Sequence, residues 1–307
     1  MDNMAKLVEC IPNFSEGRNK VLINNIADAI QGTASVVLLD YSSDASHNRS
    51  VFTFAGSPEG VLDAAFKSAK IAVEKIDLTK HSGGHPRMGA VDVIPLVPLK
   101  ETGMEECVEL SRKLGLRLWE ELKLPVFLYE ESAANLERRN LAVLRKGQFE
   151  GMAEKIKKPE FVPDYGNEIH KTAGIVACGA RKPLIAFNIN LDTGKIEIAK
   201  KIAKIIRESS GGLKSVKSIG IMLNERNTAQ VSINMTDYTQ TPLYRVLELV
   251  KIEAARYGVS VTGTEIIGLV PMKALVDCAE YYLMTEKFNF ENQVLENFLL
   301  SYAKPSE

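Results

Sequence analysis

The pentapeptide Asn13-Phe14-Ser15-Glu16-Gly17 decides the fold, because the chain repeats its pattern as Asn190-Leu191-Asp192-Thr193-Gly194. Each pentapeptide ends an apolar run, residues 7–14 or residues 184–191, that predicts a buried strand. A helical pattern of apolar residues follows each turn. The chain therefore contains the same strand–turn–helix opening twice.

The two openings are followed by the same order of predicted elements. In the first half, strands at residues 36–39 and 50–55 enclose a polar loop at residues 40–48, a helix starts at Ser57-Pro58, and a last strand spans residues 91–98. In the second half, strands at residues 217–223 and 230–235 enclose a polar loop at residues 224–228, a helix starts at Thr241-Pro242, and a last strand ends at Pro271. A hydroxyl residue before proline is a common start of a helix.

This order, β-α-β-β-α-β, predicts an α/β (α+β) fold of two ferredoxin-like subdomains, residues 1–178 and 179–307. The repeat distance of 177 residues from Asn13 to Asn190 indicates internal duplication. Each unit leaves one sheet face uncovered, so we expect the two to face each other across a substrate cleft. Between the copies we predict helices at residues 104–123 and 133–146, a strand at residues 125–129 and a long loop at residues 155–174.

The composition is that of an ordinary globular protein. The 307 residues are 45% hydrophobic and carry a net charge of −1, which gives no electrostatic reason to expect nucleic acid or an anionic membrane as a partner. No apolar run approaches the ~18 residues of a membrane span, and the N-terminus lacks the apolar core of a signal peptide. Four scattered cysteines indicate thiols in a reducing compartment, so we expect a cytoplasmic protein.

The chemistry is concentrated in the stretch KHSGGHPRMGA at residues 80–90. His81 and His85 can move protons near neutral pH, and the guanidinium of Arg87 suits a carboxylate. The second half has no histidine at the matching place, which favours a functional role over a purely structural one. A metal site is not expected, because Ser82-Gly83-Gly84 disfavours a helix and no third ligand lies nearby.

Three asparagines and one arginine are further candidates. Asn48 and Arg49 lie in the predicted polar loop, where they either reach the cleft or are solvated. Asn13 and Asn190 are expected to hold their turns through their side chains. The sequence shows no nucleophile elbow, Walker loop or dinucleotide-binding fingerprint, so acid–base chemistry is the preferred interpretation.

The chain resembles the formiminotransferase family, folate-dependent enzymes of histidine degradation. The matching segments are VECIPNFSEG at residues 8–17, HSGGHPRMGA at residues 81–90 with Asp92, GARK at residues 179–182 with AFNIN at residues 186–190, and GLVPMKAL at residues 268–275. The resemblance covers essentially the whole chain. It implies two α/β subdomains that face each other across a cleft, usually in a homodimer, with tetrahydrofolate as co-substrate, here in the monofunctional form without the cyclodeaminase domain.

The resemblance also implies roles for individual residues. The family's catalytic histidine falls on His85, the general acid and base, while His81 supports the loop or a substrate oxygen. The family's folate loop falls on Gly166, Asn167, Glu168, Ile169, His170, Lys171, Thr172, Ala173 and Gly174, although it is about one residue shorter here than in the fused mammalian form. Substrate-binding or supporting roles are expected for Asn13, Asn48, Arg49, His81 and Arg87. Arg87 either binds a substrate carboxylate or orients the loop.

Three functions stay open from the sequence. The first is transfer of a formimino group between N-formimino-L-glutamate and N5 of tetrahydrofolate. The second is transfer of a formyl group from 5-formyltetrahydrofolate to glutamate on the same site. The third is folate binding without turnover. The basic run at residues 155–158 is expected to be solvated, or alternatively to attract the glutamate tail of a folate.

Overall fold

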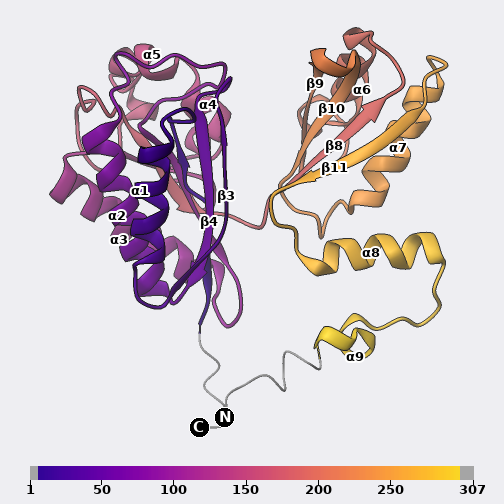
Figure 1. Cartoon of the computed structure of the whole chain (residues 1–307), viewed down its shortest axis with the longest axis horizontal. Coiled ribbons are helices and arrows are strands. Elements are labelled where there is room, and N and C mark those ends of the chain that lie inside the picture. The colour runs from indigo at the N-terminus through magenta and orange to yellow at the C-terminus, as the bar shows by residue number, and fades with distance from the viewer. Residues whose placement is uncertain (1–5, 298–307) are drawn as a thin grey trace. The chain divides into compact units, whose positions relative to one another are not determined.

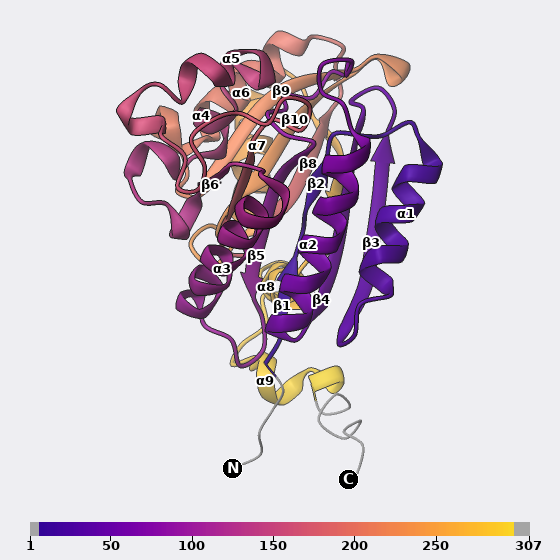
Figure 2. The ribbon, with the colours of Figure 1, turned by 90° about the vertical axis from the view of Figure 1, so that its left-hand side faces the viewer.

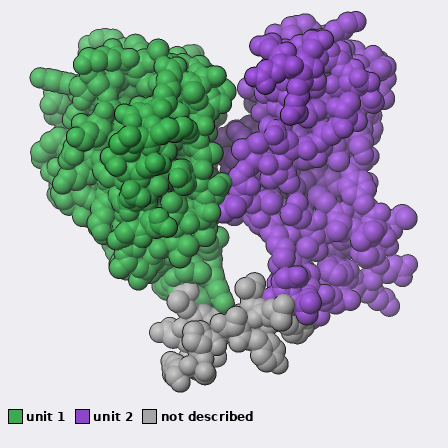
Figure 3. Space-filling model, viewed as in Figure 1, with its two compact units in different colours: residues 1–182 green, residues 183–307 purple. Residues whose placement is uncertain are grey.

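A computed structural model describes residues 6–297, and the chain divides into two compact units, residues 1–182 and 183–307 (Figures 1 and 3). The boundary expected after residue 178 falls inside strand β7 (Val176–Ala180). This strand pairs in parallel with two strands of the first unit, so it belongs to that unit as a whole. The division therefore lies four residues later than the sequence indicates.

The first unit is built on a sheet with strands in the order β3, β4, β1 with β2, β5, β7 and β6. These strands are β1 (Val8–Cys10), β2 (Asn13–Phe14), β3 (Val36–Asp44), β4 (Arg49–Gly56), β5 (Val91–Pro98), β6 (Val126–Leu128) and β7. β1 and β2 are two parts of one strand, because each pairs antiparallel with both β4 and β5. Taken as one, they give the ferredoxin-like order 4-1-3-2, to which β7 and β6 add a parallel extension.

Three helices cover one face of this sheet: α1 (Lys20–Gln31), α2 (Pro58–Lys75) and α3 (Met104–Leu122) (Figure 2). The start of α2 is as predicted, since Ser57 Oγ accepts a hydrogen bond of 3.2 Å from the backbone N–H of Gly60. Asn19 caps α1 in the same way. The caps and the apolar helix faces are local features, which is why the sequence predicts these elements well.

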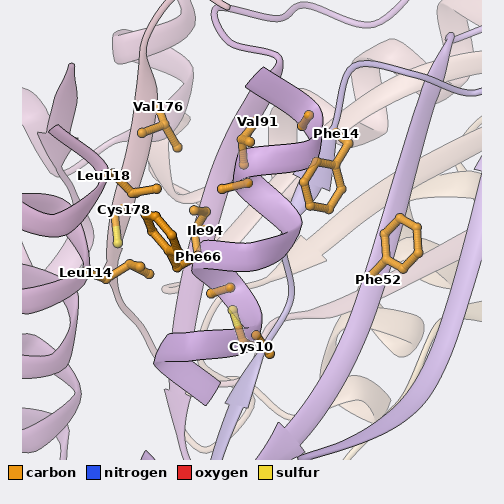
Figure 4. Packing of buried hydrophobic residues seen from close by; sticks show 14 of the residues in the cluster. Cys10, Phe14, Phe52, Phe66, Val91, Ile94, Leu114, Leu118, Val176 and Cys178 are labelled. Carbon is orange, nitrogen blue, oxygen red and sulfur yellow. The ribbon is translucent and has the colours of Figure 1, made fainter. Parts of the chain in front are cut away.

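The hydrophobic core of the first unit has two parts, one on each side of the sheet. Phe14, Phe52, Ile94 and Leu118 belong to the larger part, between the sheet and the three helices (Figure 4). The smaller part, on the other side of β6 and β7, holds Phe127, Tyr129 and Ala177 of these strands and the segments that follow them, together with Leu144 of α4 (Leu141–Arg145) and Met152 of α5 (Gln148–Lys155). Burial on both faces fixes α4 and α5 against the end of the sheet.

The second unit has a four-stranded antiparallel sheet within residues 183–297, in the order β11, β8, β10, β9. Its strands are β8 (Ile185–Leu191), β9 (Val216–Leu223), β10 (Thr228–Met235) and β11 (Val261–Ile267), and its helices are α6 (Ile196–Ile206), α7 (Leu243–Ala255), α8 (Met272–Leu283) and α9 (Phe290–Gln293). The strand order is again 4-1-3-2, so the ferredoxin-like plan predicted for both halves is confirmed.

Several predicted bounds are wrong for physical reasons. The polar loop at residues 40–48 is shorter, because β3 continues to Asp44 in register with Arg49. The helix predicted at residues 133–146 is instead a short turn, Leu136–Arg138, followed by α4, since Asn135 and Asn140 cap each piece separately. The loop predicted at residues 155–174 begins at the end of α5 and includes a further turn, Pro159–Phe161.

In the second unit the start of α7 also differs from the prediction. The hydroxyl of Thr241 donates 2.7 Å to the carbonyl of Lys214 instead of capping the helix, and Pro242 takes the capping position. The last strand ends at Ile267, before Pro271, which stands at the N-cap of α8. Among the described residues, no helix is long and apolar enough to cross a membrane.

Candidate active site

The histidine-rich segment of residues 80–90 joins α2 to β5 and packs against the turn between β3 and β4. Gly84 N–H donates 3.1 Å to the carbonyl of Ser46. A Cβ atom on Gly83 would lie 2.3 Å from the carbonyl oxygen of His47 and 2.8 Å from Cβ of Asn48. Only glycine permits this contact, and the two backbone segments therefore lie directly against each other.

Asn48 joins three segments of the site. Its Oδ1 accepts 2.9 Å from Gly17 N–H, and its Nδ2 donates 3.0 Å to the carbonyl of Ser82. Its side chain is buried and its backbone is left-handed, with φ of 50°. Asn48 is thus a structural link and is not solvated. Asn13 donates 3.0 Å to the carbonyl of Ile11, which holds the interruption between β1 and β2.

Both ring nitrogens of His81 are engaged within the protein. Nε2 lies 3.1 Å from the carbonyl oxygen of Asn48, to which it can only donate, and Nδ1 accepts 3.2 Å from Nε of Arg87. This pattern fixes one neutral tautomer. Burial lowers the pKa of His81 in agreement with the geometry. His81 therefore orients its neighbours and has no nitrogen left for a substrate.

Arg87 is buried and turned towards the protein. Its guanidinium meets the carboxylate of Glu150 at two points, with Nη2–Oε1 at 2.6 Å and Nη1–Oε2 at 3.0 Å. Nη1 also donates 2.9 Å to Oε1 of Gln148. With Nε bound to His81, this guanidinium joins the histidine segment to the first turn of α5. The arrangement corresponds to the loop-orienting alternative, not to a free carboxylate receptor.

His85 lies beside Arg49, the first residue of β4. Nη1 of Arg49 is 3.0 Å from Nε2 and 3.4 Å from Nδ1 of the imidazole. Because Nη1 is at similar distances from both ring nitrogens, it lies over the face of the imidazole and not along either lone pair. Burial, followed by the positive charges of Arg49 and Arg145, lowers the pKa of His85 to about 3. His85 is therefore a base that carries no proton at neutral pH.

A buried ion pair lies next to this base. Arg145, at the end of α4, pairs with Asp92 of β5, whose side chain is 2% exposed. Oδ1 of Asp92 accepts 2.8 Å from the backbone N–H of Met88. The pKa of Arg49 is affected by both members of this ion pair. Burial and then Arg145 lower the pKa, whereas Asp92 raises it. The ring of His47 stands 6.4 Å from that of His85, centroid to centroid.

Four of these residues, His47, Arg145, Gln148 and Glu150, are not predicted from the sequence, and Asp92 stands out only as part of a matching segment. Arg145 and Asp92 are 53 positions apart, and Arg87 and Glu150 are 63 apart, so no local pattern joins them. The one usable signal is that the histidine segment precedes the buried strand β5 and that Arg49 begins β4, since functional polar side chains often collect at the ends of buried strands.

The loop at residues 166–174 is joined to the histidine segment at its C-terminal end. The carbonyl of Thr172 accepts 2.8 Å from Leu78 N–H, and the carbonyl of Ala173 accepts 2.9 Å from Ala90 N–H. His170 closes the loop on itself, since its Nδ1 accepts 3.0 Å from Ala173 N–H. Gly166, at the other end, packs against Trp119 of α3. The structure thus brings residues 172–174 beside the site and places residue 166 away from this contact.

The described part of this site contains no set of side chains that could hold a metal ion. Within residues 6–297, no group of three or more histidine, cysteine, aspartate or glutamate side chains is arranged to hold a metal ion. The nitrogens of His81 are taken by protein groups, and His85 faces a guanidinium. The arrangement can bind an anion at Arg49 and accept a proton at His85.

Comparisons with known proteins match both units. Residues 7–181 fit the N-terminal subdomain of the formiminotransferase domain, and residues 186–298 fit the formiminotransferase domain. The chain is 57% identical to a glutamate formimidoyltransferase of Streptococcus pyogenes serotype M1, over 97% of this chain and 100% of that protein. It is 50% identical to a glutamate formimidoyltransferase of Thermoplasma acidophilum, over 94% of this chain and 96% of that protein. It is 47% identical to a formimidoyltransferase-cyclodeaminase of Gallus gallus, over 92% of this chain and 54% of that protein.

Proposed function

Because the chain belongs to the formiminotransferase family, we propose that it transfers a formimino group between N-formimino-L-glutamate and N5 of tetrahydrofolate, with His85 moving the protons. The observation that carries this proposal is the neutral imidazole of His85 beside the guanidinium of Arg49. The base accepts protons, and the cation suits a substrate that carries carboxylates.

The steps balance with one proton acceptor. In the folate-forming direction, N5 of tetrahydrofolate forms a bond to the carbon of the protonated formimino group while His85 takes the proton from N5. The π electrons of the C=N bond move onto the imino nitrogen, and they form this double bond again when the glutamate nitrogen leaves. The tetrahedral intermediate then breaks its bond to the glutamate nitrogen, which receives a proton from His85. A histidine that accepts and returns one proton in this way contributes typically about 10²- to 10⁴-fold to the rate.

The other parts of the site support these two steps. The fixed tautomer of His81 and the two-point hold on Arg87 keep the histidine segment in place. We assign the folate to the loop at residues 166–174, whose end is bonded to the same segment. The family resemblance further implies a homodimer in the cytoplasm that acts in histidine degradation and one-carbon metabolism, and we propose these with the activity.

The test is an assay of formimino transfer from N-formimino-L-glutamate to tetrahydrofolate with the purified full chain. We expect formimino transfer, and we expect His85→Ala to lose it while folate binding and the unfolding curve stay close to those of the unchanged protein. A parallel assay offers 5-formyltetrahydrofolate and glutamate. Turnover of the formyl donor alone would overturn the proposal in favour of formyl transfer, and folate binding without either turnover would assign a binding protein.

A further inference from the structure

Two arginines from distant parts of the first unit lie at the histidine segment: Arg49 contacts His85, and Arg145 pairs with Asp92, which is bonded to the backbone of Met88. Arg49 is the first residue of β4 and Arg145 is the last residue of α4, so β5 lies between them in the sequence. Arg49 touches the imidazole directly, with 3.0 Å between Nη1 and Nε2. The side chain of Arg145 is 17% exposed, and its Nε has no hydrogen-bond partner among the described residues.

The charges around His85 do not cancel. Arg49 and Arg145 contribute two positive charges, and Asp92 supplies one buried negative charge. The remaining nearby acid, Asp44, is exposed and bonded to His47, 3.2 Å from its Nδ1. A partly buried site with an excess cation is stabilised by an anion that enters it.

Arg145 is also held firmly by its own segment. The ammonium group of Lys155 donates to the carbonyls of Val143, Leu144 and Lys146, on either side of Arg145. Lys155 is buried, which corrects the expectation that the whole basic run at residues 155–158 is solvated. The end of α4 is thus fixed by a buried cation, and the guanidinium of Arg145 is positioned before any substrate binds.

We propose that Arg145 is a substrate-binding residue which, together with Arg49, binds a carboxylate of the glutamate part beside His85. The inference rests on the function proposed above. A carboxylate binds a guanidinium more strongly than the face of a neutral imidazole does, so Arg49 pairs with the carboxylate when it arrives.

The same event changes the electrostatics of the base. A bound carboxylate cancels the positive charges that lower the pKa of His85, so this pKa moves up towards its ordinary value. The base is weak in the free protein and becomes effective only when the amino-acid substrate is in place.

The first experiment follows the histidine side chains of the full chain by NMR with ¹⁵N-labelled histidine, and His85→Gln identifies the signal. We expect Arg145→Gln to raise the pKa of His85 by about one unit or more, because one positive charge is removed. The matched control is Arg139→Gln, since Arg139 lies in the same stretch but pairs with Glu131 on the surface. Addition of L-glutamate should raise the pKa of His85 in the unchanged protein and much less in Arg145→Gln.

The second experiment separates substrate binding from folding. Arg145→Gln should raise KM for N-formimino-L-glutamate by about 10- to 100-fold with a smaller change in KM for tetrahydrofolate. Since this variant leaves Asp92 without its cation, the double variant Arg145→Gln with Asp92→Asn restores the charge balance. If Arg145 binds substrate, KM stays high in the double variant, whereas recovery of KM would show a structural role and overturn the proposal.

The outcomes also distinguish this inference from the proposed function. The pKa of His85 in the free protein does not depend on any substrate, so its response to Arg145→Gln can be measured even if formimino transfer fails. An unchanged pKa, or an effect equal to that of Arg139→Gln, would overturn the role of Arg145 while leaving the transfer activity to be judged by its own assay.

Discussion

The carboxylate of Glu150 holds Arg87 at two points, although the two residues lie on separate segments and only Arg87 is buried. Without this carboxylate, the buried guanidinium of Arg87 keeps only neutral partners, His81 and Gln148. We expect Glu150→Gln to lower the free energy of unfolding of the first unit by about 1–2 kcal/mol. The measurement is urea unfolding followed by the fluorescence of Trp119, the one tryptophan of the sequence, which lies in α3 of that unit.

The control for this change is Glu154→Gln, one position before the last residue of the same helix. Glu154 pairs with Lys157 on the surface, where both side chains are well exposed. Surface pairs contribute at most about 1 kcal/mol and usually less. Equal losses in the two variants would show that the hold on Arg87 adds nothing beyond an ordinary surface charge.

Gly83 and Gly151 offer a pair of glycine-to-alanine changes with opposite expected signs. A Cβ atom at Gly83 would collide with the backbone of His47, whereas at Gly151, inside α5, nothing lies within 4 Å. Gly83→Ala should destabilise the first unit and lower transfer activity, because the histidine segment must move away from the turn after β3. Gly151→Ala should stabilise the unit by about 0.5–1 kcal/mol, as alanine does within a helix.

The same unfolding measurement checks both glycine variants, with transfer activity as a second readout. A Gly83→Ala protein of unchanged stability and unchanged activity would contradict the close approach of the two segments. The Gly151→Ala variant shows how large an effect the loss of glycine flexibility has when no collision occurs.

The stability of the first unit should depend on pH through its neutral histidines. Burial lowers the folded-state pKa of His81, His85 and His170, and that of His85 falls to about 3. In the unfolded chain these groups take up protons as the pH falls below about 6.5. Stability is therefore greatest above the unfolded pKa and is lost as the pH falls from about 6.5 towards the folded pKa.

We expect the free energy of unfolding to decrease between pH 7 and pH 5, a range above the ordinary titration of carboxylates. His85→Gln should make this decrease smaller, because one group that gains a proton on unfolding has been removed. Unfolding curves at pH 5, 6 and 7 measure the effect. A protein that is more stable at pH 5, or a variant with the same slope as the unchanged protein, would exclude this linkage.

The sequence predicts those elements whose signals are local. Ser57 before Pro58 marks the start of α2, and the apolar run of residues 91–98 matches β5 throughout. β7 was not predicted, because all its residues are buried and its run Val-Ala-Cys-Gly-Ala shows neither alternation nor large apolar side chains. The prediction that Lys155 is solvated is wrong for a similar reason. Its partners are three backbone carbonyls, and no pattern of residue types in the sequence indicates them.

The candidate site follows the same rule. The glycines and histidines of residues 80–90 stand out in the sequence, and the resemblance selects His85 among them. Its setting depends on pairs such as Arg49 with His85 and Arg145 with Asp92, which come together only through strand register and helix packing. Residue types therefore indicate the chemistry, while the charge balance that makes His85 a neutral base needs the three-dimensional structure.

The position of β7 has a consequence for how the chain is synthesised. This strand is the last of its sheet to leave the ribosome, yet it lies between β5 and β6, which emerge before it. Until residue 180 has been made, the nascent chain exposes one edge of β5, and the three residues of β6 lack the neighbour with which they pair in the finished sheet. An open strand edge invites pairing with other chains. When β7 pairs with β5 and β6, it therefore closes this exposed edge. In the same step, the residues just before β7 form their backbone hydrogen bonds to the histidine segment.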